Sequence, residues 1–217
     1  MMKHIFLLGT FLASVFFAYT QPDSKAKQIL DEVSQKTRSY KSISADFVFS
    51  MENKEMEIFE QNEGSIKLKG QKYVVELPDI GVKVFSDGKT IWNYMSDGNQ
   101  VTISNMEDGG SELMDPSSVF TIYEKGFQSR YAGEKTIENE KVHQIELFPD
   151  NESYEVSKIL LSISEDDKMI KSALLYGTDG NIYGIEVKKM DTQTELPDSF
   201  FVFNTGDYGD VEVIDFR

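Results

Sequence analysis

The chain has 217 residues but no cysteine, only two histidines, five prolines and a single tryptophan. Without cysteine it has no disulfide framework, no thiolate metal site, no thiol nucleophile and no lipobox for lipid attachment. His143 is the only histidine beyond the first residues, which excludes a His-rich zinc site. Nucleophile-elbow, phosphate-loop and calcium-loop motifs are also missing. We therefore expect no metal and no cofactor, and we interpret His143 as a packing or surface residue.

Long apolar runs are absent beyond the N-terminus, so no later stretch is long and apolar enough to span a bilayer. Met1–His4 is short and positively charged, and the apolar run Ile5–Phe17 follows it. Ala18–Thr20 then has small residues at both ends, as at a signal-peptide cleavage site. We predict that residues 1–20 are a cleaved signal peptide rather than a membrane anchor. Export without disulfides fits a bacterial periplasm or surface.

Positive charge is scarce: the chain has 22 Lys and Arg residues and 37 Asp and Glu residues, which gives a net charge of −15. Removal of residues 1–20 takes away Lys3 and no acidic residue, which leaves 21 against 37, or −16. Nucleic acid and anionic headgroups repel such a chain, so we expect neither as a partner. The acidic residues are scattered, which indicates a solvated exterior, and an aromatic content of 12% indicates an ordered body.

Helical spacing of apolar residues predicts an amphipathic helix over residues 22–40, with Pro22–Ser24 as its start and cap. Its apolar stripe consists of Ala26, Ile29, Leu30 and Val33. The residues favour a helix that covers the core, and a mobile lid is the alternative. A second, shorter helix is predicted to begin at Asp115–Pro116. The apolar residues of this second helix are Val119, Phe120, Ile122, Tyr123 and Phe127.

Elsewhere apolar and polar residues alternate with period two, which is typical of strands. The predicted strands are Ala45–Met51, Met56–Phe59, Gly64–Lys69, Tyr73–Leu77, Val82–Phe85, Ile91–Tyr94, Gln100–Ile103, Val142–Phe148, Ser157–Ser164, Ile170–Tyr176, Ile182–Lys189, Phe200–Phe203 and Val211–Phe216. Asp87–Gly88 is the strongest hairpin signal among the turns. We predict one domain over residues 21–217, mainly β (α+β), in which the helices cover a single curved antiparallel sheet or barrel.

Large apolar side chains are more numerous than two helices can cover. Trp92 and Tyr94 share one face of their strand by period two. We therefore predict one concave apolar face with a cavity, since the mouths of such barrels are frequent ligand sites. Its candidate residues are Phe47, Phe49, Leu68, Val75, Trp92, Tyr94, Phe120, Leu147, Leu160, Tyr176, Phe201 and Phe203. For each single residue, a packed core is the alternative interpretation.

The hairpin Phe85–Tyr94, with the sequence FSDGKTIWNY, resembles the signature of the LolA family of outer-membrane lipoprotein carriers. The order of the surrounding elements is also similar to that family, over essentially the whole mature chain. The further segments that carry the resemblance are Tyr40–Phe47 at the first strand, Gly64–Lys69 at the second, Asp115–Pro116 at the mid-chain helices, and the C-terminal Phe201 and Phe203 with the final acidic strand.

The resemblance implies an incomplete antiparallel barrel with a helical lid, and a monomeric periplasmic carrier rather than an enzyme. Such a carrier shields acyl chains and moves lipoproteins from an inner-membrane lipoprotein-releasing transporter to an outer-membrane acceptor, which the sequence does not identify. The implied lid residues are Ile29, Leu30, Val33, Val119 and Tyr123. Family members commonly carry an Arg-Pro pair, associated with lid closure and hand-over, where this chain has Gly70–Gln71. We therefore do not assign this lid latch, the arginine's role in lid closure and hand-over, to this chain.

Three other classes stay open. The same half-barrel suits an envelope-stress sensor or another module that binds hydrophobic ligands. An enzyme using cavity carboxylates would show acidic residues converging in the cavity. A structural or adhesive surface protein would lack a cavity.

Overall fold

A computed structural model describes residues 23–106, 126–151 and 154–217, which form one α-helix, short 3-10 turns and a twelve-stranded sheet. The helix is α1, Ser24–Ser39. The strands are β1 Ile43–Asn53, β2 Ile58–Lys69, β3 Lys72–Leu77, β4 Val82–Ser86, β5 Thr90–Met95, β6 Gln100–Asn105, β7 Phe127–Ile137, β8 Glu140–Pro149, β9 Val156–Ser164, β10 Ile170–Gly177, β11 Ile182–Asp191 and β12 Glu212–Asp215. The 3-10 turns are Pro78–Ile80, Asp198–Phe201 and Thr205–Asp207.

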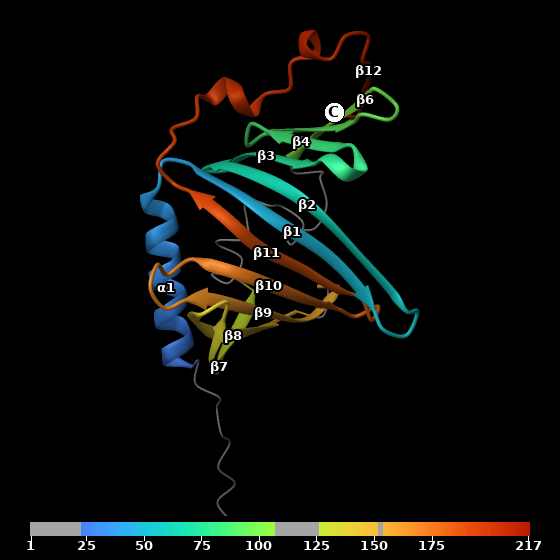
Figure 1. The fold of residues 1–217 in the computed structure, drawn as a ribbon. Coiled ribbons are helices and arrows are strands. Elements are labelled where there is room, and N and C mark those ends of the chain that lie inside the picture. Colours follow the sequence, from blue (N-terminus) through green and yellow to red (C-terminus); the bar gives the residue numbers. More distant parts are fainter. Residues whose placement is uncertain (1–22, 107–125, 152–153) are drawn as a thin grey trace, which may run out of the picture.

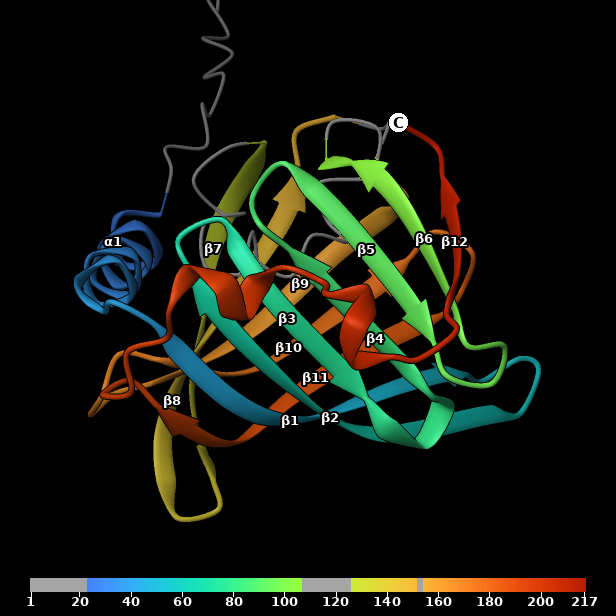
Figure 2. The ribbon, with the colours of Figure 1, turned by 90° about the horizontal axis from the view of Figure 1, so that it is seen from above.

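The strands lie in the order β12-β6-β5-β4-β3-β2-β1-β11-β10-β9-β8-β7. Two meanders, β1 to β6 and β7 to β11, are therefore joined where β1 pairs with β11 (Figure 1). The sheet stays open because β12 and β7 are its two edges. The expected antiparallel sheet is confirmed except at β12, which pairs with β6 in parallel. The chain reaches β12 from β11 through residues 192–211, which pass over the sheet (Figure 2).

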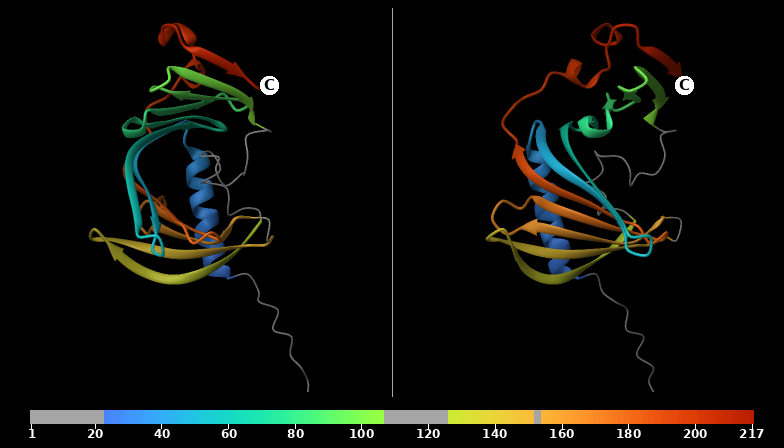
Figure 3. Two further views of the ribbon diagram at one scale, coloured as in Figure 1. Left: turned by 90° about the vertical axis from the view of Figure 1, so that its right-hand side faces the viewer. Right: turned by 45° about the vertical axis from the view of Figure 1, so that its right-hand side comes forward.

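The sheet curves strongly, so it has an inner and an outer face. Figure 3 shows α1 inside the curve, beside β7 to β11. Figure 2 shows residues 192–211, which we call the C-terminal strap, crossing the outside of β3 and β4. The two faces of this one sheet are therefore covered by different parts of the chain.

The predicted N-terminal helix is confirmed as α1, and its stripe is buried on the inner face. Ala26, Ile29, Leu30 and Val33 are at most 5% exposed and belong to the same cluster as Ile145, Leu147 and Leu161 of the sheet. Such burial explains the helical period of these residues, because the stripe leaves water on folding. In the described part of the chain no helix combines the length and apolar character that crossing a membrane requires.

Asp23 fixes the start of α1 to the edge strand β7. Its Oδ1 accepts from the backbone N–H groups of Lys25 and Ala26, as an N-cap does. Its Oδ2 accepts from the N–H of Tyr131 at 2.8 Å, and this bond is the main cause of a lowered pKa of the Asp23 carboxyl. Lys25 Nζ lies 3.8 Å from the centre of the Tyr131 ring. The N-terminal end of the helix is therefore anchored, and its role as a lid stays a prediction.

The C-terminal strap forms a second cluster on the outer face of β3 to β6. Phe201 and Phe203 are 0% and 7% exposed, and they pack with Val74, Phe85 and Val101. The expected strand Phe200–Phe203 is wrong, because Asp198–Phe201 is a 3-10 turn that follows Pro197. Its aromatic side chains dock onto the face of a sheet instead of alternating within one.

A second correction concerns Phe127, which begins β7 and does not end a helix. Gly126 before it has φ of 78°, a left-handed conformation that does not continue a right-handed helix. Phe127, Ser129 and Tyr131 then alternate with more exposed residues, as in a strand with one buried face. The predicted signal peptide and the remainder of the predicted second helix, including Val119, Phe120 and Tyr123, lie outside the described residues.

We predict that Phe201→Ala lowers the free energy of unfolding by about 3–5 kcal/mol, since it removes a fully buried aromatic ring. Phe200→Ala is the matched control, because that neighbouring ring is 36% exposed, and we expect about 1 kcal/mol or less. Urea unfolding followed by the fluorescence of Trp92 measures both. Equal losses would contradict the placement of Phe201 in the core of the strap.

Asp198 ties the strap to the sheet through Lys72 and Lys69, with Nζ–O distances of 2.6 and 2.9 Å. Lys72 and then Lys69 lower the pKa of the Asp198 carboxyl to about 2. The folded-state pKa lies below the unfolded one, so this contribution to stability is present above about pH 4 and disappears as the pH falls through 2.

We therefore expect Asp198→Asn to be less stable than the parent at pH 7, with the difference shrinking between pH 4 and pH 2. Unfolding measured across this pH range tests it. Asp207→Asn, in the same strap but without an ion pair in the described residues, should show no such trend. A pH-independent difference for Asp198→Asn would contradict the assignment.

Candidate functional site

The inner face carries continuous rows of apolar side chains across neighbouring strands. Cross-strand pairing places Ile145, Leu161, Ala173, Ile185 and Phe49 in one row from β8 to β1. The first three are 0%, 2% and 5% exposed, whereas Ile185 and Phe49 are only half-buried. Burial therefore decreases along the row, from the part of the face that packs with α1 to the strands in the middle of the sheet.

A second row of paired side chains shows the same decrease in burial from β8 to β11. Leu147 and Ile159 are at most 2% exposed, while Leu175 and Tyr183, which follow on β10 and β11, are half-buried. The Tyr183 ring stacks with Phe49 at 6.4 Å between ring centres. The middle of the inner face thus presents aromatic and aliphatic surface that the protein covers incompletely.

Gly64 makes room on this face. A Cβ at this position would lie 2.7 Å from both Phe47 Cζ and Leu77 Cδ2, which is closer than such atoms approach. The glycine therefore lets these two side chains lie flat on β2. Val75 and Val84, paired across β3 and β4, extend the same half-buried surface. We call the half-buried residues Phe47, Phe49, Val75, Leu77, Val84, Leu175, Tyr183 and Ile185 the inner apolar surface.

The structure divides the twelve candidate cavity residues between opposite faces. Those on the inner face are Phe47, Phe49, Leu68, Val75 and Leu147. Trp92 and Tyr94 lie on the outer face under the strap that holds Phe201 and Phe203. Leu160 and Tyr176 also point outward, because they alternate with the inner residues Leu161 and Leu175. The expectation of one shared face is therefore wrong, and Phe120 lies outside the described residues.

Leu68 and Leu147 are 5% and 0% exposed and belong to the packed core of the inner face. Only Phe47, Phe49 and Val75 of the predicted set are on the inner apolar surface. Leu77 was missed although it is two residues after Val75, a spacing that period two makes equivalent. Ile185 and Val84 were also missed, although the alternation of side chains along their strands places them on the inner face.

In the described ranges no Asp or Glu is buried, and no group of three or more His, Asp or Glu side chains is arranged to hold a metal ion. His143 is 8% exposed, and its Nδ1 lies 3.3 Å from the Tyr131 hydroxyl, so it packs within the β7–β8 pair. Gly70–Gln71 forms the exposed turn between β2 and β3, away from this surface.

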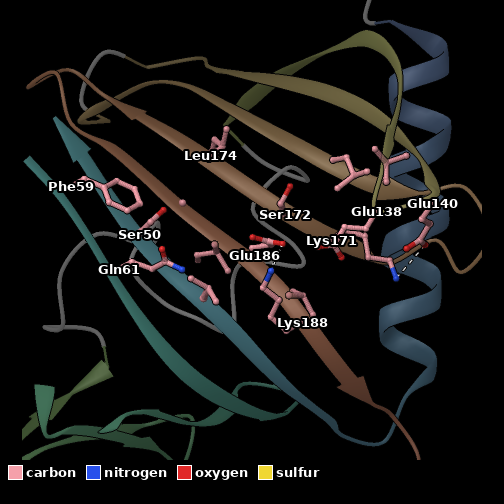
Figure 4. Close-up of a pocket in the computed structure, with 16 residues that line it drawn as sticks. Ser50, Phe59, Gln61, Glu138, Glu140, Lys171, Ser172, Leu174, Glu186 and Lys188 are labelled. Carbon is pink, nitrogen blue, oxygen red and sulfur yellow. Dashed lines mark hydrogen bonds and ion pairs between the residues drawn. The ribbon is translucent and has the colours of Figure 1, made fainter. Parts of the chain in front are cut away.

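A separate open cavity of about 480 Å³ lies on the outer face. Figure 4 shows it between Phe59 and Gln61 of β2 at one end and Glu138 and Glu140 at the other. Its floor comes from β1, β10 and β11. No prediction from the sequence concerned this cavity.

The family described as "Outer membrane lipoprotein carrier protein LolA" matches residues 38–204, well over half of the chain. The chain belongs to the LolA family. This finding confirms the resemblance carried by the Phe85–Tyr94 hairpin. A comparison with curated proteins gives no match.

A solved structure supports the fold. An uncharacterized conserved protein from Thermus thermophilus superposes with a TM-score of 0.60 at 16% identity, over 88% of this chain and 99% of that chain. Two further structures are more distant. The lipoprotein LppX of Mycobacterium tuberculosis gives 0.47 at 14% identity, over 79% and 99%. A LolA superfamily protein from Nitrosomonas europaea gives 0.44 at 13% identity, over 82% and 97%.

We predict that Gly64→Val weakens binding of an N-lauroyl tripeptide about tenfold, because it pushes Phe47 and Leu77 into the space over the inner apolar surface. Tenfold corresponds to the lost burial of about two methylene groups at ~0.8 kcal/mol each. Titration calorimetry measures the affinity. Ser65→Val, the next position on the opposite face of β2, is the control and should bind like the parent.

Proposed function

We propose that this protein is a periplasmic carrier that shields the acyl chains of lipoproteins on its inner apolar surface and moves them from the inner to the outer membrane. Membership of the LolA family supports a carrier and binding role rather than catalysis. The proposal includes export by a signal peptide, a releasing transporter in the inner membrane as donor, and a monomeric carrier.

The observation that carries this proposal is the exposure gradient on the inner face. Ile145, Leu161 and Ala173 are packed as in any core, yet Ile185 and Phe49 of the same row are half-buried. Leaving aromatic and branched aliphatic side chains partly in water costs free energy that an apolar ligand would recover on binding. A ligand without polar groups suits a lining without buried carboxylates.

The energetic need for such a carrier is large. Three acyl chains carry about 45 methylene groups, whose exposure to water would cost roughly 36 kcal/mol at ~0.8 kcal/mol each. A lipoprotein therefore cannot cross an aqueous compartment without an apolar container. The net charge of −16 after removal of residues 1–20 supports the same role, because an acidic carrier does not adhere to anionic headgroups on the way.

A release assay tests the proposal. Inner-membrane vesicles bearing a labelled triacylated lipoprotein and its releasing transporter are incubated with the mature chain. We expect a soluble one-to-one complex with the parent and at least about a tenfold loss with Phe47→Arg, which places a charge on the inner apolar surface. The half-buried Phe47 is preferable to the buried Leu68, whose replacement would disturb the core.

Ser44→Arg is the matched control, because it places the same side chain on the outer face of the same strand. Circular dichroism establishes that each variant is folded. Absence of release by the folded parent would contradict the carrier role. If the parent then still binds the N-lauroyl tripeptide, a sensor or another hydrophobic-ligand module on the same fold is favoured instead.

A further inference from the structure

The outer-face cavity is separate from the inner apolar surface although it uses the same strands. Ser50 of β1 pairs with Gly184 and Gln61, and Leu174 of β10 pairs with Gly184, so these residues share one face. The side chains of Phe49 and Ile185, their neighbours in sequence, point to the other face, although Ile185 also borders the cavity. A ligand in this cavity would therefore bind on the opposite side of the sheet from an acyl chain.

Small residues hollow out the cavity floor. Gly184 is buried, and a Cβ there would overlap Ser50 Oγ and lie 3.3 Å from Leu174 Cδ2. Ser172 and Val48 lie beside these residues on the paired strands. At the end formed by β2, Phe59 is 65% exposed, which is high for an aromatic side chain next to a cavity. The floor therefore accepts an apolar group, and Phe59 offers it a ring face.

Lysines at the other end of the cavity are already neutralised. Lys171 Nζ lies 2.9 Å from Asp167 and 3.2 Å from Glu140, and Lys188 Nζ lies 2.5 Å from Glu186. Glu138 remains at the rim, exposed and without an ion pair in the described residues. Glu138 is the first residue of the two-residue turn between β7 and β8. Residues 138 and 139 both have positive φ, as in a type I′ hairpin turn, and this turn places Glu138 at the rim of the cavity.

Acidic side chains continue along the same face beyond the cavity. Glu63 of β2 pairs with Val48, and Asp46 lies two residues before Val48 on β1, so both point outward beside the floor. Both are exposed and neither forms an ion pair in the described residues. Two of these carboxylates have a lysine nearby, since Lys189 pairs with Asp46 across the strands and Lys188 interacts with Glu138. Glu63 has Val48 opposite it, so the carboxylates around the floor still outnumber the lysines, and such an excess attracts cations and repels anionic groups.

We propose that the outer-face cavity is a docking site for a basic segment of a partner protein, in which one apolar side chain has Lys or Arg on either side. The apolar side chain packs on Ser50, Gly184 and Leu174. The flanking cations meet Glu138 and Glu63, and an arginine stacks on Phe59. The docking proposal does not depend on acyl-chain binding, so it can be refuted while the carrier role holds, and the reverse.

The probe is the capped tetrapeptide acetyl-Leu-Arg-Phe-Arg-amide, titrated into the mature chain and followed by backbone amide chemical shifts. We expect saturable shifts on outer-face residues of β1, β2, β10 and β11 and affinity that falls with added salt. The charge-reversed peptide acetyl-Leu-Glu-Phe-Glu-amide should show no saturable binding. Equal binding of the two peptides, or shifts confined to residues around Phe47 and Phe49, would overturn the proposal.

Two variants locate the site. Ser50→Phe fills the cavity from its floor and should weaken the basic peptide about tenfold. Its control is Ser44→Phe, another half-buried serine on the same face of β1 that lies outside the cavity. Glu138→Gln changes only an exposed rim charge and cannot disturb the core, and it should weaken binding about threefold and reduce the salt dependence. Parent-like affinity of folded Ser50→Phe and of Glu138→Gln would refute the site.

Discussion

The antiparallel pairing of β1 with β11 is the interaction on which the rest of the structure depends. It consists of nine residue pairs between segments that lie more than 120 residues apart in the sequence. Without it the two meanders would be separate sheets. Because side chains alternate along both strands, this pairing builds two surfaces at once. The half-buried inner residues Phe49 and Ile185 and the outer cavity residues Ser50 and Gly184 all sit at this joint.

The two faces are closed in physically different ways. On the outer face of β3 to β6, aromatic rings of the strap interlock: Phe203 stacks on Tyr208 at 4.4 Å and meets Phe85 edge-on at 5.6 Å. Such packing is dense and geometrically specific, as in a core that never opens. On the inner face, α1 closes one end with small and branched residues and leaves the middle half-buried. The part of the outer face under the strap is therefore packed shut, whereas the inner face keeps apolar side chains partly exposed.

Much of this arrangement could be predicted from the sequence, but not which face each residue occupies. Helix α1 and most strands follow from periodicity, because their apolar residues repeat with period 3.6 or two. In the run Ile159–Leu161 every residue is apolar, so apolar–polar alternation does not show which side chains point inward. Leu160 was therefore assigned to the wrong face of the sheet. Trp92 was misplaced for another reason. The strap that covers it is distant in sequence and lacks strand alternation, so only tertiary packing decides the face.

If the protein carries acyl chains as proposed, their release has to be explained without the arginine latch that the family resemblance suggested. Gly70 and Gln71 form the exposed β2–β3 turn, where Gln71 lies beside Gly88 of the β4–β5 turn. The N-terminal end of α1 is held by Asp23 on Tyr131, so this end of the helix is not free to swing. Among the described residues, retention of a ligand therefore rests on apolar contact with partly exposed side chains. Such contact is non-directional and incompletely packed, so in the proposed carrier it would hold an acyl chain without the specific fit that opposes hand-over.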